Sequence, residues 1–150
     1  MKDCLFCKIV KGEIPCYKIY EDKDFLAFLD IYPNTKGMTL IIPKKHYSSD
    51  SFDMPREAYI NLMLISKKIA KILEKKLNVK RVALVMEGMG VDHVHIKLYP
   101  LHGLKEKFTE TWVDKRIFFQ KYQGYITTLM GKRMSDKKLK ELVKKITEKS

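Results

Sequence analysis

The sequence predicts an α+β fold in which an antiparallel sheet packs against one long helix. Three observations lead to this prediction: short apolar segments separated by turn-forming residues, a single long segment of helical periodicity between them, and connections short enough for hairpins rather than crossovers. A chain of 150 residues with 45% hydrophobic residues is long enough to bury one substantial core, so we expect a single domain.

Three strands are expected in the N-terminal half. Residues 16–20 and 24–29 form two short strands around a turn-prone segment. A proline and a glycine within residues 33–37 then break the chain, because proline fixes φ and glycine admits turn conformations. An apolar strand over residues 38–42 follows, and Pro43 closes it.

One long helix is expected after these strands. Residues 51–53 can cap it, and Pro55 fits its first turn, where a missing N–H costs nothing. Apolar residues then recur at helical spacing with lysines behind them, namely Leu62, Ile65, Ile69, Ile72 and Leu73. A strand over residues 81–86 and a glycine-containing turn over 87–90 follow the helix.

The next strand, within residues 92–100, carries an unusual row of polar side chains. Side chains on a strand alternate between its two faces, so His93, His95 and Lys97 share one face. The opposite face is unbroken and apolar, with Val94, Ile96 and Leu98. Two histidines and a lysine on one face opposite a core face indicate a functional site, although a polar face that merely meets solvent remains the alternative.

A second cluster of chemically active residues lies near the N-terminus. Cys4 and Cys7 have the spacing that a single zinc ion accepts, and two histidines would complete the tetrahedral site. The histidines available are His46, His93, His95 and His102. The alternatives are a redox pair or two small buried hydrophobic residues. Cys16 has no partner and is expected to be a packed free thiol.

No clear periodicity appears beyond Pro100 until a final helix. Ser135 is placed to cap that helix, and its apolar face comprises Leu139, Leu142, Val143 and Ile146. We therefore expect residues 1–103 to form the functional domain and residues 104–150 to form a C-terminal extension packed on the same domain.

The net charge of +12 suits an anionic ligand such as a nucleotide. Many lysines nevertheless fall on what are expected to be solvated helix faces, and no nucleic-acid-binding motif accompanies them. The charge therefore does not indicate a protein that recognises a nucleic acid sequence. No apolar run approaches the roughly 20 residues that span a membrane, and no signal-peptide core opens the sequence, so a cytoplasmic protein without a membrane partner is expected.

Taken together, these segments resemble the histidine-triad (HIT) family of nucleotide hydrolases and transferases. The matching residues, in chain order, are Cys4-x-Phe6-Cys7-Lys8-Ile9-Val10-x-Gly12-Glu13-Ile14-Pro15, Tyr20-Glu21-Asp22, Ala27-Phe28-Leu29-Asp30-Ile31-x-Pro33, Leu40-Ile41-Ile42-Pro43-Lys44-x-His46 and the strand from His93 to Pro100. The resemblance implies a five-stranded antiparallel sheet with a packed central helix, here with a C-terminal helical extension, and a homodimer. It makes residues 1–103 a HIT-like nucleotide-binding domain.

The resemblance also implies roles for individual residues. His95 matches the histidine that attacks the α-phosphorus of a nucleotide, and Asp30 matches the carboxylate that binds the ribose hydroxyls. The residues that match the apolar pocket around the base are Phe6, Ile9, Ile14, Phe28 and Ile31. In zinc-bearing members of the family, the ligands of the structural zinc ion correspond to Cys4, Cys7, His46 and His93.

The sequence departs from the common family pattern at four positions. Lys97 stands where the third histidine of the triad usually helps the leaving group depart. Met38 replaces a frequent histidine, and Met89 and Gly90 replace residues that usually touch the phosphate. Lys97 would oppose protonation of His95 and offer positive charge to phosphate oxygens, so it is expected to be catalytic.

These observations predict a nucleotidyl hydrolase that acts at the α-phosphate of purine nucleotide derivatives through a nucleotidyl-histidine intermediate. Adenosine phosphoramidates and diadenosine polyphosphates are the substrates that the resemblance implies. The alternatives are a nucleotidyltransferase or phosphorylase of the same superfamily, and a catalytically weak nucleotide-binding regulator. A nucleic acid partner is not expected, although some relatives act on adenylylated DNA ends.

Overall fold

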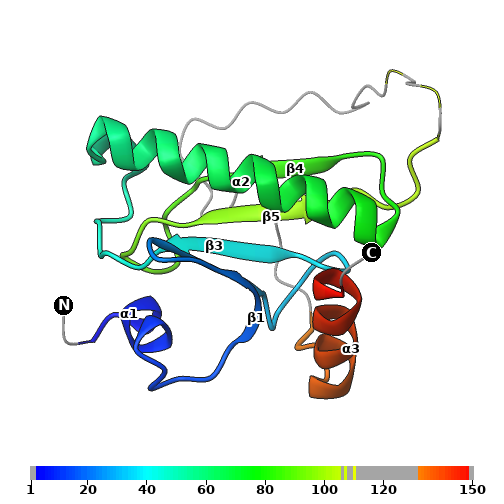
Figure 1. Cartoon of the computed structure of the whole chain (residues 1–150), viewed down its shortest axis with the longest axis horizontal. Coiled ribbons are helices and arrows are strands. Elements are labelled where there is room, and N and C mark those ends of the chain that lie inside the picture. The colour runs from blue at the N-terminus through cyan, green and yellow to red at the C-terminus, as the bar shows by residue number, and fades with distance from the viewer. Residues whose placement is uncertain (1–2, 106, 108–109, 111–131, 149–150) are drawn as a thin grey trace, which may run out of the picture.

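The protein folds around one five-stranded sheet that carries helices on both faces (Figure 1). The structure is a computed structural model that describes residues 3–105, 107, 110 and 132–148. Its strands are β1 (Tyr17–Glu21), β2 (Phe25–Leu29), β3 (Thr39–Pro43), β4 (Val82–Val85) and β5 (Ile96–Pro100). Its helices are α1 (Leu5–Val10), the 3-10 turn η1 (Ser51–Asp53), α2 (Arg56–Leu77) and α3 (Asp136–Thr147).

The sheet has the strand order β1-β2-β3-β5-β4, and every neighbouring pair is antiparallel. The predicted α+β class with an antiparallel sheet is therefore confirmed. The predicted strands occur in the predicted order, but they begin one residue later than expected in β1, β2, β3 and β4. The strand expected within residues 92–100 is shorter than predicted: β5 begins only at Ile96, after His93 and His95.

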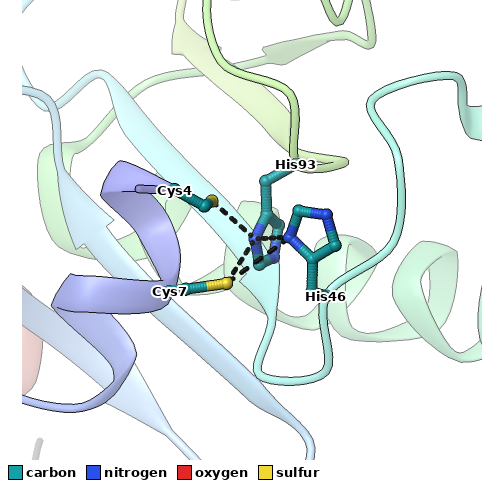
Figure 2. A group of neighbouring side chains, drawn as sticks. All are labelled: Cys4, Cys7, His46 and His93. Atoms are coloured by element: carbon teal, nitrogen blue, oxygen red, sulfur yellow. Dashed lines mark hydrogen bonds between the residues drawn. The ribbon is translucent and has the colours of Figure 1, made fainter. Parts of the chain in front are cut away.

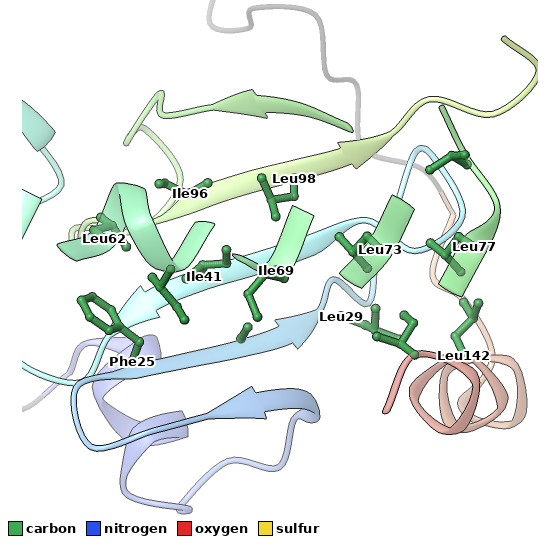
Figure 3. Packing of buried hydrophobic residues seen from close by; sticks show 14 of the residues in the cluster. Phe25, Leu29, Ile41, Leu62, Ile69, Leu73, Leu77, Ile96, Leu98 and Leu142 are labelled. Atoms are coloured by element: carbon green, nitrogen blue, oxygen red, sulfur yellow. The ribbon is translucent and has the colours of Figure 1, made fainter. Parts of the chain in front are cut away.

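The two faces of the sheet support two separate cores. On β2, Phe25, Ala27 and Leu29 face α2, whereas Leu26 and Phe28 face α1. Helix α2 runs along the sheet and contributes buried residues from successive turns, including those seen in Figure 3: Leu62, Ile69, Leu73 and Leu77. This face supplies the main hydrophobic core, while the smaller cluster on the α1 face lies beside the polar row of β5.

Helix α2 does not start as the sequence predicted. The expectation that residues 51–53 cap α2 is wrong: these residues form the separate turn η1, whose cap is Asp50. Met54, which precedes a proline, is extended at φ −67° and ψ 144°, and this conformation ends the turn. The helix begins at Arg56, with Pro55 immediately before it and no side-chain cap. Proline's steric effect on the residue before it thus separates the two segments.

Helix α3 lies beside β1 and the C-terminal part of α2 (Figure 1). Ser135 caps it as predicted, since its side chain accepts a hydrogen bond from the Lys138 N–H. Leu139, Leu142 and Ile146 join the main core. Most of the segment without clear periodicity lies outside the described residues. Among the described helices, none combines the length and apolar character needed to cross a bilayer.

Candidate metal centre and active site

Four potential metal ligands converge between α1 and the sheet, as Figure 2 shows. Cys4 immediately precedes α1 and Cys7 lies within it, while His46 follows β3 and His93 precedes β5. Their ligand atoms all lie within 4.8 Å of one another. Helix α1, which no sequence pattern predicted, therefore presents the two thiols at its start toward two histidines from distant parts of the chain.

The distances within this cluster match a tetrahedral zinc site. Two Zn–N bonds of about 2.0–2.1 Å would place the nitrogens about 3.3 Å apart, and one such bond with a Zn–S bond of about 2.3 Å would place nitrogen and sulfur about 3.6 Å apart. His46 Nδ1 and His93 Nδ1 are 3.3 Å apart. Cys7 Sγ lies 3.4 Å from the first and 3.6 Å from the second, and Cys4 Sγ lies 3.5 Å from His93 Nδ1. The donors therefore fit zinc in both chemistry and spacing.

The backbone orients His93 for this role. His93 Nε2 lies 2.9 Å from the Pro43 carbonyl oxygen, which can only accept a hydrogen bond. Nε2 therefore carries the proton, and Nδ1 presents its lone pair to the cysteines and His46. Burial also lowers the pKa of His93, so its neutral, metal-binding form is favoured. The three cysteines are free thiols in the structure.

His95 is held next to this centre in a buried position. Its side chain is on the same face as His93, and the residue is only 3% exposed. His95 Nδ1–H donates to the His93 carbonyl oxygen at 2.8 Å, which leaves Nε2 as the basic and nucleophilic nitrogen. Burial lowers the pKa of His95, and the positive charge of Lys97 lowers it further. The neutral form of the ring is therefore favoured near pH 7.

Lys97 follows His95 on the same face of the strand, as the alternation predicted. Its side chain is partly shielded, and its Nζ lies 3.6 Å from Glu87 Oε2. In the sequence, Glu87 lies in a predicted turn, and no sequence pattern indicates a role for it. Glu87 lies two residues beyond the end of β4, and the pairing of Val85 with Lys97 brings this segment close to Lys97.

An aromatic and aliphatic cluster adjoins His95. The Phe6 ring meets Phe28 edge-on at 6.0 Å and His95 edge-on at 5.3 Å between centroids. Ile9 packs against the same cluster. Ile9 and Ile14 also line a cavity of about 320 Å³ between the end of α1 and strands β1 and β2. Four of the five predicted base-pocket residues therefore gather on the α1 face.

Asp30 and Ile31, at the end of β2, are placed differently. Asp30 Oδ1 accepts a hydrogen bond from the Tyr32 N–H at 2.7 Å, and the negative charge of Asp30 raises the pKa of His95 slightly against the larger lowering by burial. Ile31 instead packs against the main core on the α2 face, and its carbonyl accepts a hydrogen bond from the Met134 N–H. The structure thus brings Asp30 toward the site but does not place Ile31 with the other pocket residues.

Two of the positions that depart from the family pattern, and the remaining histidine His102, lie in different surroundings. Met38 is buried, whereas Met89 is exposed on the loop that follows β4. His102 is exposed, and its Nε2 bonds to the Lys36 carbonyl oxygen at 2.9 Å. His102 therefore lies in a loop contact, apart from the Cys4, Cys7, His46 and His93 cluster.

Comparison with known proteins places this arrangement in a family. The HIT-domain model matches residues 11–103, which is more than half of the chain and includes the histidines just described. The chain belongs to the HIT family.

Several relatives resemble the chain over most of their length. An uncharacterized HIT-like protein of Methanocaldococcus jannaschii is 45% identical over 103 residues, which cover 65% of this chain and 78% of that protein. The adenosine 5′-monophosphoramidase of Saccharomyces cerevisiae is 39% identical over 130 residues, which cover 86% of this chain and 82% of that protein. The crystal structure of a Zn-bound histidine triad family protein from Mycobacterium smegmatis superposes with a TM-score of 0.69 at 26% identity and covers 97% and 91% of the two chains.

Membership of the HIT family confirms the predicted fold and the prediction of a HIT-type enzyme. The cluster of Cys4, Cys7, His46 and His93 fits a structural zinc ion, as predicted. The individual catalytic and substrate-binding roles remain predictions at this point. The geometry brings Phe6 against both Phe28 and His95, and it places Glu87 beside Lys97.

Proposed function

We propose that the protein is a zinc-containing nucleotidyl hydrolase that acts at the α-phosphate of purine nucleotide derivatives through a nucleotidyl-histidine intermediate. The observation that carries the proposal is the orientation of His95. A buried, neutral imidazole has its Nδ1–H engaged by the His93 carbonyl oxygen, so its Nε2 is the nitrogen available for attack. In this role the ring needs no rearrangement to become a nucleophile.

The reaction consists of two displacements at the same phosphorus. His95 Nε2 forms a bond to the α-phosphorus while the bond to the leaving group breaks, and the leaving group departs with the electron pair and takes up a proton from solvent. Water then attacks the phosphorus, the N–P bond breaks, and a nucleoside monophosphate and a proton are released. The second step regenerates the neutral imidazole, so the cycle is balanced.

The remaining residues bind and orient the nucleotide. The apolar side chains proposed to hold the base are Phe6, Ile9, Ile14 and Phe28, with Ile31 assigned on the resemblance alone. Asp30, at the end of β2, would accept hydrogen bonds from the ribose hydroxyls. Lys97 would stabilise the phosphate oxygens, which gain negative charge during each displacement.

Zinc has a structural role in this proposal. Cys4, Cys7, His46 and His93 would hold the ion, and together they would supply four protein donors. A bound ion would link the N-terminal segment to the sheet. Phe6 lies between the two cysteines in the sequence, so this link would also keep its ring against His95.

Adenosine phosphoramidates are the first substrates to test. The S. cerevisiae relative and a 40% identical protein of Schizosaccharomyces pombe are both adenosine 5′-monophosphoramidases. Diadenosine polyphosphates offer the same α-phosphorus with a different leaving group. The shared reacting centre makes a direct comparison of the two substrate classes informative.

The test is to trap the covalent intermediate. Protein mixed with α-³²P-labelled adenosine 5′-phosphoramidate is quenched within a single turnover, and the label that stays with the protein is measured. We expect acid-labile, base-stable label on wild-type protein and on His102→Ala, which removes an exposed loop histidine, but none on His95→Ala. Turnover without any protein-bound label in rapid-quench experiments would overturn the covalent mechanism.

A nucleotidyltransferase is the second candidate, and Lys97 is the observation that favours it. A lysine in place of the third histidine is a branch feature that we propose here, and it removes the usual proton donor for the leaving group. Inorganic phosphate added to the same assay distinguishes the two. Formation of ADP at the expense of AMP indicates phosphorolysis, whereas AMP alone indicates hydrolysis. Nucleotide binding without any turnover would instead indicate the regulator.

We also propose a cytoplasmic homodimer in which residues 1–103 form the nucleotide-binding domain and 104–150 the extension. Strand β4 is an edge strand, and its Leu84 is 40% exposed on the α2 side of the sheet. Ile60 and Leu64 of α2 are also exposed apolar residues. Light scattering that gives the mass of one 17.7 kDa chain would overturn the dimer.

The proposed cytoplasmic location is supported by the cysteines. A reducing compartment would keep the Cys4 and Cys7 thiols available for zinc.

A further inference from the structure

Glu87 reaches the polar face of the sheet through the pairing of β4 with β5. Val85 is paired with Lys97 in the antiparallel register. Glu87 lies two residues beyond the end of β4, and its carboxylate contacts the Lys97 ammonium, so its side chain reaches the same face of the sheet as Lys97. The segment that follows β4 therefore borders the candidate active site.

The loop that follows Glu87 is fastened to the rest of the protein. Gly88 has φ +75°, and a Cβ atom there would lie 2.5 Å from the Ser49 carbonyl oxygen, so the two backbones approach closely. Four residues later, Asp92 Oδ1 accepts a hydrogen bond from the Ser49 N–H at 2.9 Å. These contacts hold the loop against the segment that follows His46, and they restrict where the Glu87 carboxylate can lie.

The Lys97–Glu87 contact is shielded from solvent. Lys97 Nζ lies 3.6 Å from Glu87 Oε2, and the two side chains are 20% and 10% exposed. By comparison, the surface pair Lys71–Glu74 is 69% and 22% exposed. Electrostatic interactions are screened less in a shielded pair. Lys97 follows His95 by two residues on the same face of the strand, so the ion pair lies beside the proposed nucleophile.

We propose that Glu87 is a positioning residue that holds the Lys97 ammonium over the α-phosphate beside His95. The inference rests on the proposed function, because it assigns Lys97 a phosphate to contact. Lysine has a flexible four-carbon stem, and a fixed carboxylate restricts its ammonium to a small volume. A histidine at this position would need no such partner, because its ring has only two side-chain torsions.

The distance between the two groups suits a positioning role. A charge-assisted hydrogen bond between an ammonium and a carboxylate is about 2.7–2.9 Å long, so at 3.6 Å Lys97 Nζ and Glu87 Oε2 form an ion pair without a direct hydrogen bond. An ammonium has three N–H donors. Because the ion pair uses none of them, Glu87 attracts the ammonium without competing with phosphate oxygens for its donors. The competing explanation is an ion pair that only stabilises the loop after β4.

A double-mutant cycle separates these explanations. The variants are Glu87→Gln, Lys97→Met and the double variant, with Lys71→Met, Glu74→Gln and their double variant as a matched surface pair. For each, kcat and KM are measured with adenosine 5′-phosphoramidate, the Kd values of AMP and adenosine are measured by calorimetry, and the melting temperature is recorded. Glu87→Asp is included as the conservative variant.

We expect Lys97→Met to lower kcat about a hundredfold and Glu87→Gln about tenfold, because the latter leaves the lysine present but unrestrained. The double variant should match Lys97→Met, since Glu87 acts only through Lys97. AMP binding should weaken in Glu87→Gln while adenosine binding stays unchanged, and Glu87→Asp should recover part of kcat. The surface pair should leave every constant unchanged.

Two outcomes would overturn the inference: additive losses of kcat and AMP affinity in the double variant, or a lowered melting temperature in Glu87→Gln with unchanged kcat and AMP affinity. Failure of the proposed function is distinguishable from both. If wild-type protein shows no turnover but Glu87 and Lys97 remain coupled in AMP binding, the hydrolase proposal fails and the positioning role stands. If wild-type protein turns over normally but the effects of the Glu87 and Lys97 substitutions are independent, the hydrolase proposal stands and the positioning role fails.

Discussion

The imidazole of His95 is hydrogen-bonded to the backbone of His93, with His95 Nδ1 2.8 Å from the His93 carbonyl oxygen. The side chain of His93 belongs to the candidate metal centre, and its main-chain carbonyl also fixes the tautomer of the proposed nucleophile, His95. His93 Nε2 is in turn bonded to the Pro43 carbonyl oxygen of β3. A chain of contacts thus runs from β3 through His93 to His95, and it links the candidate metal centre to the candidate catalytic group.

Replacing His95 with alanine should abolish turnover while leaving nucleotide binding nearly intact. A nucleophile contributes to the transition state through bond formation, so its loss lowers kcat rather than ground-state affinity. Steady-state kinetics with adenosine 5′-phosphoramidate and calorimetric titration with AMP test both parts. Retained turnover in His95→Ala would remove the residue from the mechanism.

The protein should bind about one zinc ion per chain through Cys4, Cys7, His46 and His93. Cys7→Ser should lose most of the zinc and melt at a lower temperature, because metal binding contributes directly to folding stability. Cys16→Ser is the matched control, since Cys16 lies outside the cluster. This variant should keep its zinc. Elemental analysis and thermal unfolding provide the measurements. A metal-free wild-type protein purified without chelator, together with a Cys4–Cys7 disulfide, would contradict this prediction.

Lys97→Met should lose much of its turnover, and the loss should shrink for substrates with very good leaving groups. A positive charge that stabilises phosphate oxygens and assists departure matters less when the leaving group departs easily. The measurement is kcat/KM across a series of adenosine 5′-phosphate derivatives of graded leaving-group basicity. Full activity on every substrate would show that Lys97 is a surface lysine whose stem packs on the sheet.

Leu73→Ala should destabilise the fold without a specific effect on catalysis. Leu73 is fully buried in the main core, on the opposite face of the sheet from His95. Truncation of a buried leucine costs about 2–5 kcal/mol of the free energy of unfolding. Lys75→Ala, an exposed position on the same helix, should change it by less than about 0.5 kcal/mol. Urea unfolding gives both values, and equal stability of the two variants would contradict the assigned packing.

Short-range patterns in the sequence determined much of the architecture and part of the site. The alternation of His93, Val94, His95 and Ile96 follows from strand geometry alone, so the polar and apolar faces could be assigned before any tertiary structure was known. Ser135 as a helix cap and the two cysteines as metal ligands are equally local patterns. Such features depend on neighbouring residues, and the sequence contains them completely.

Only the tertiary structure decided which distant residues meet. Geometry and donor chemistry alone left four histidines as possible ligands, and the resemblance suggested His46 and His93; the fold brings these two within 3.3 Å of each other. Glu87 was part of a turn in the sequence, and the fold brings its carboxylate to 3.6 Å from Lys97 Nζ. Strand register and the approach of separate segments depend on how the whole core packs. No local pattern encodes them, because the interactions that select them join residues far apart in the chain.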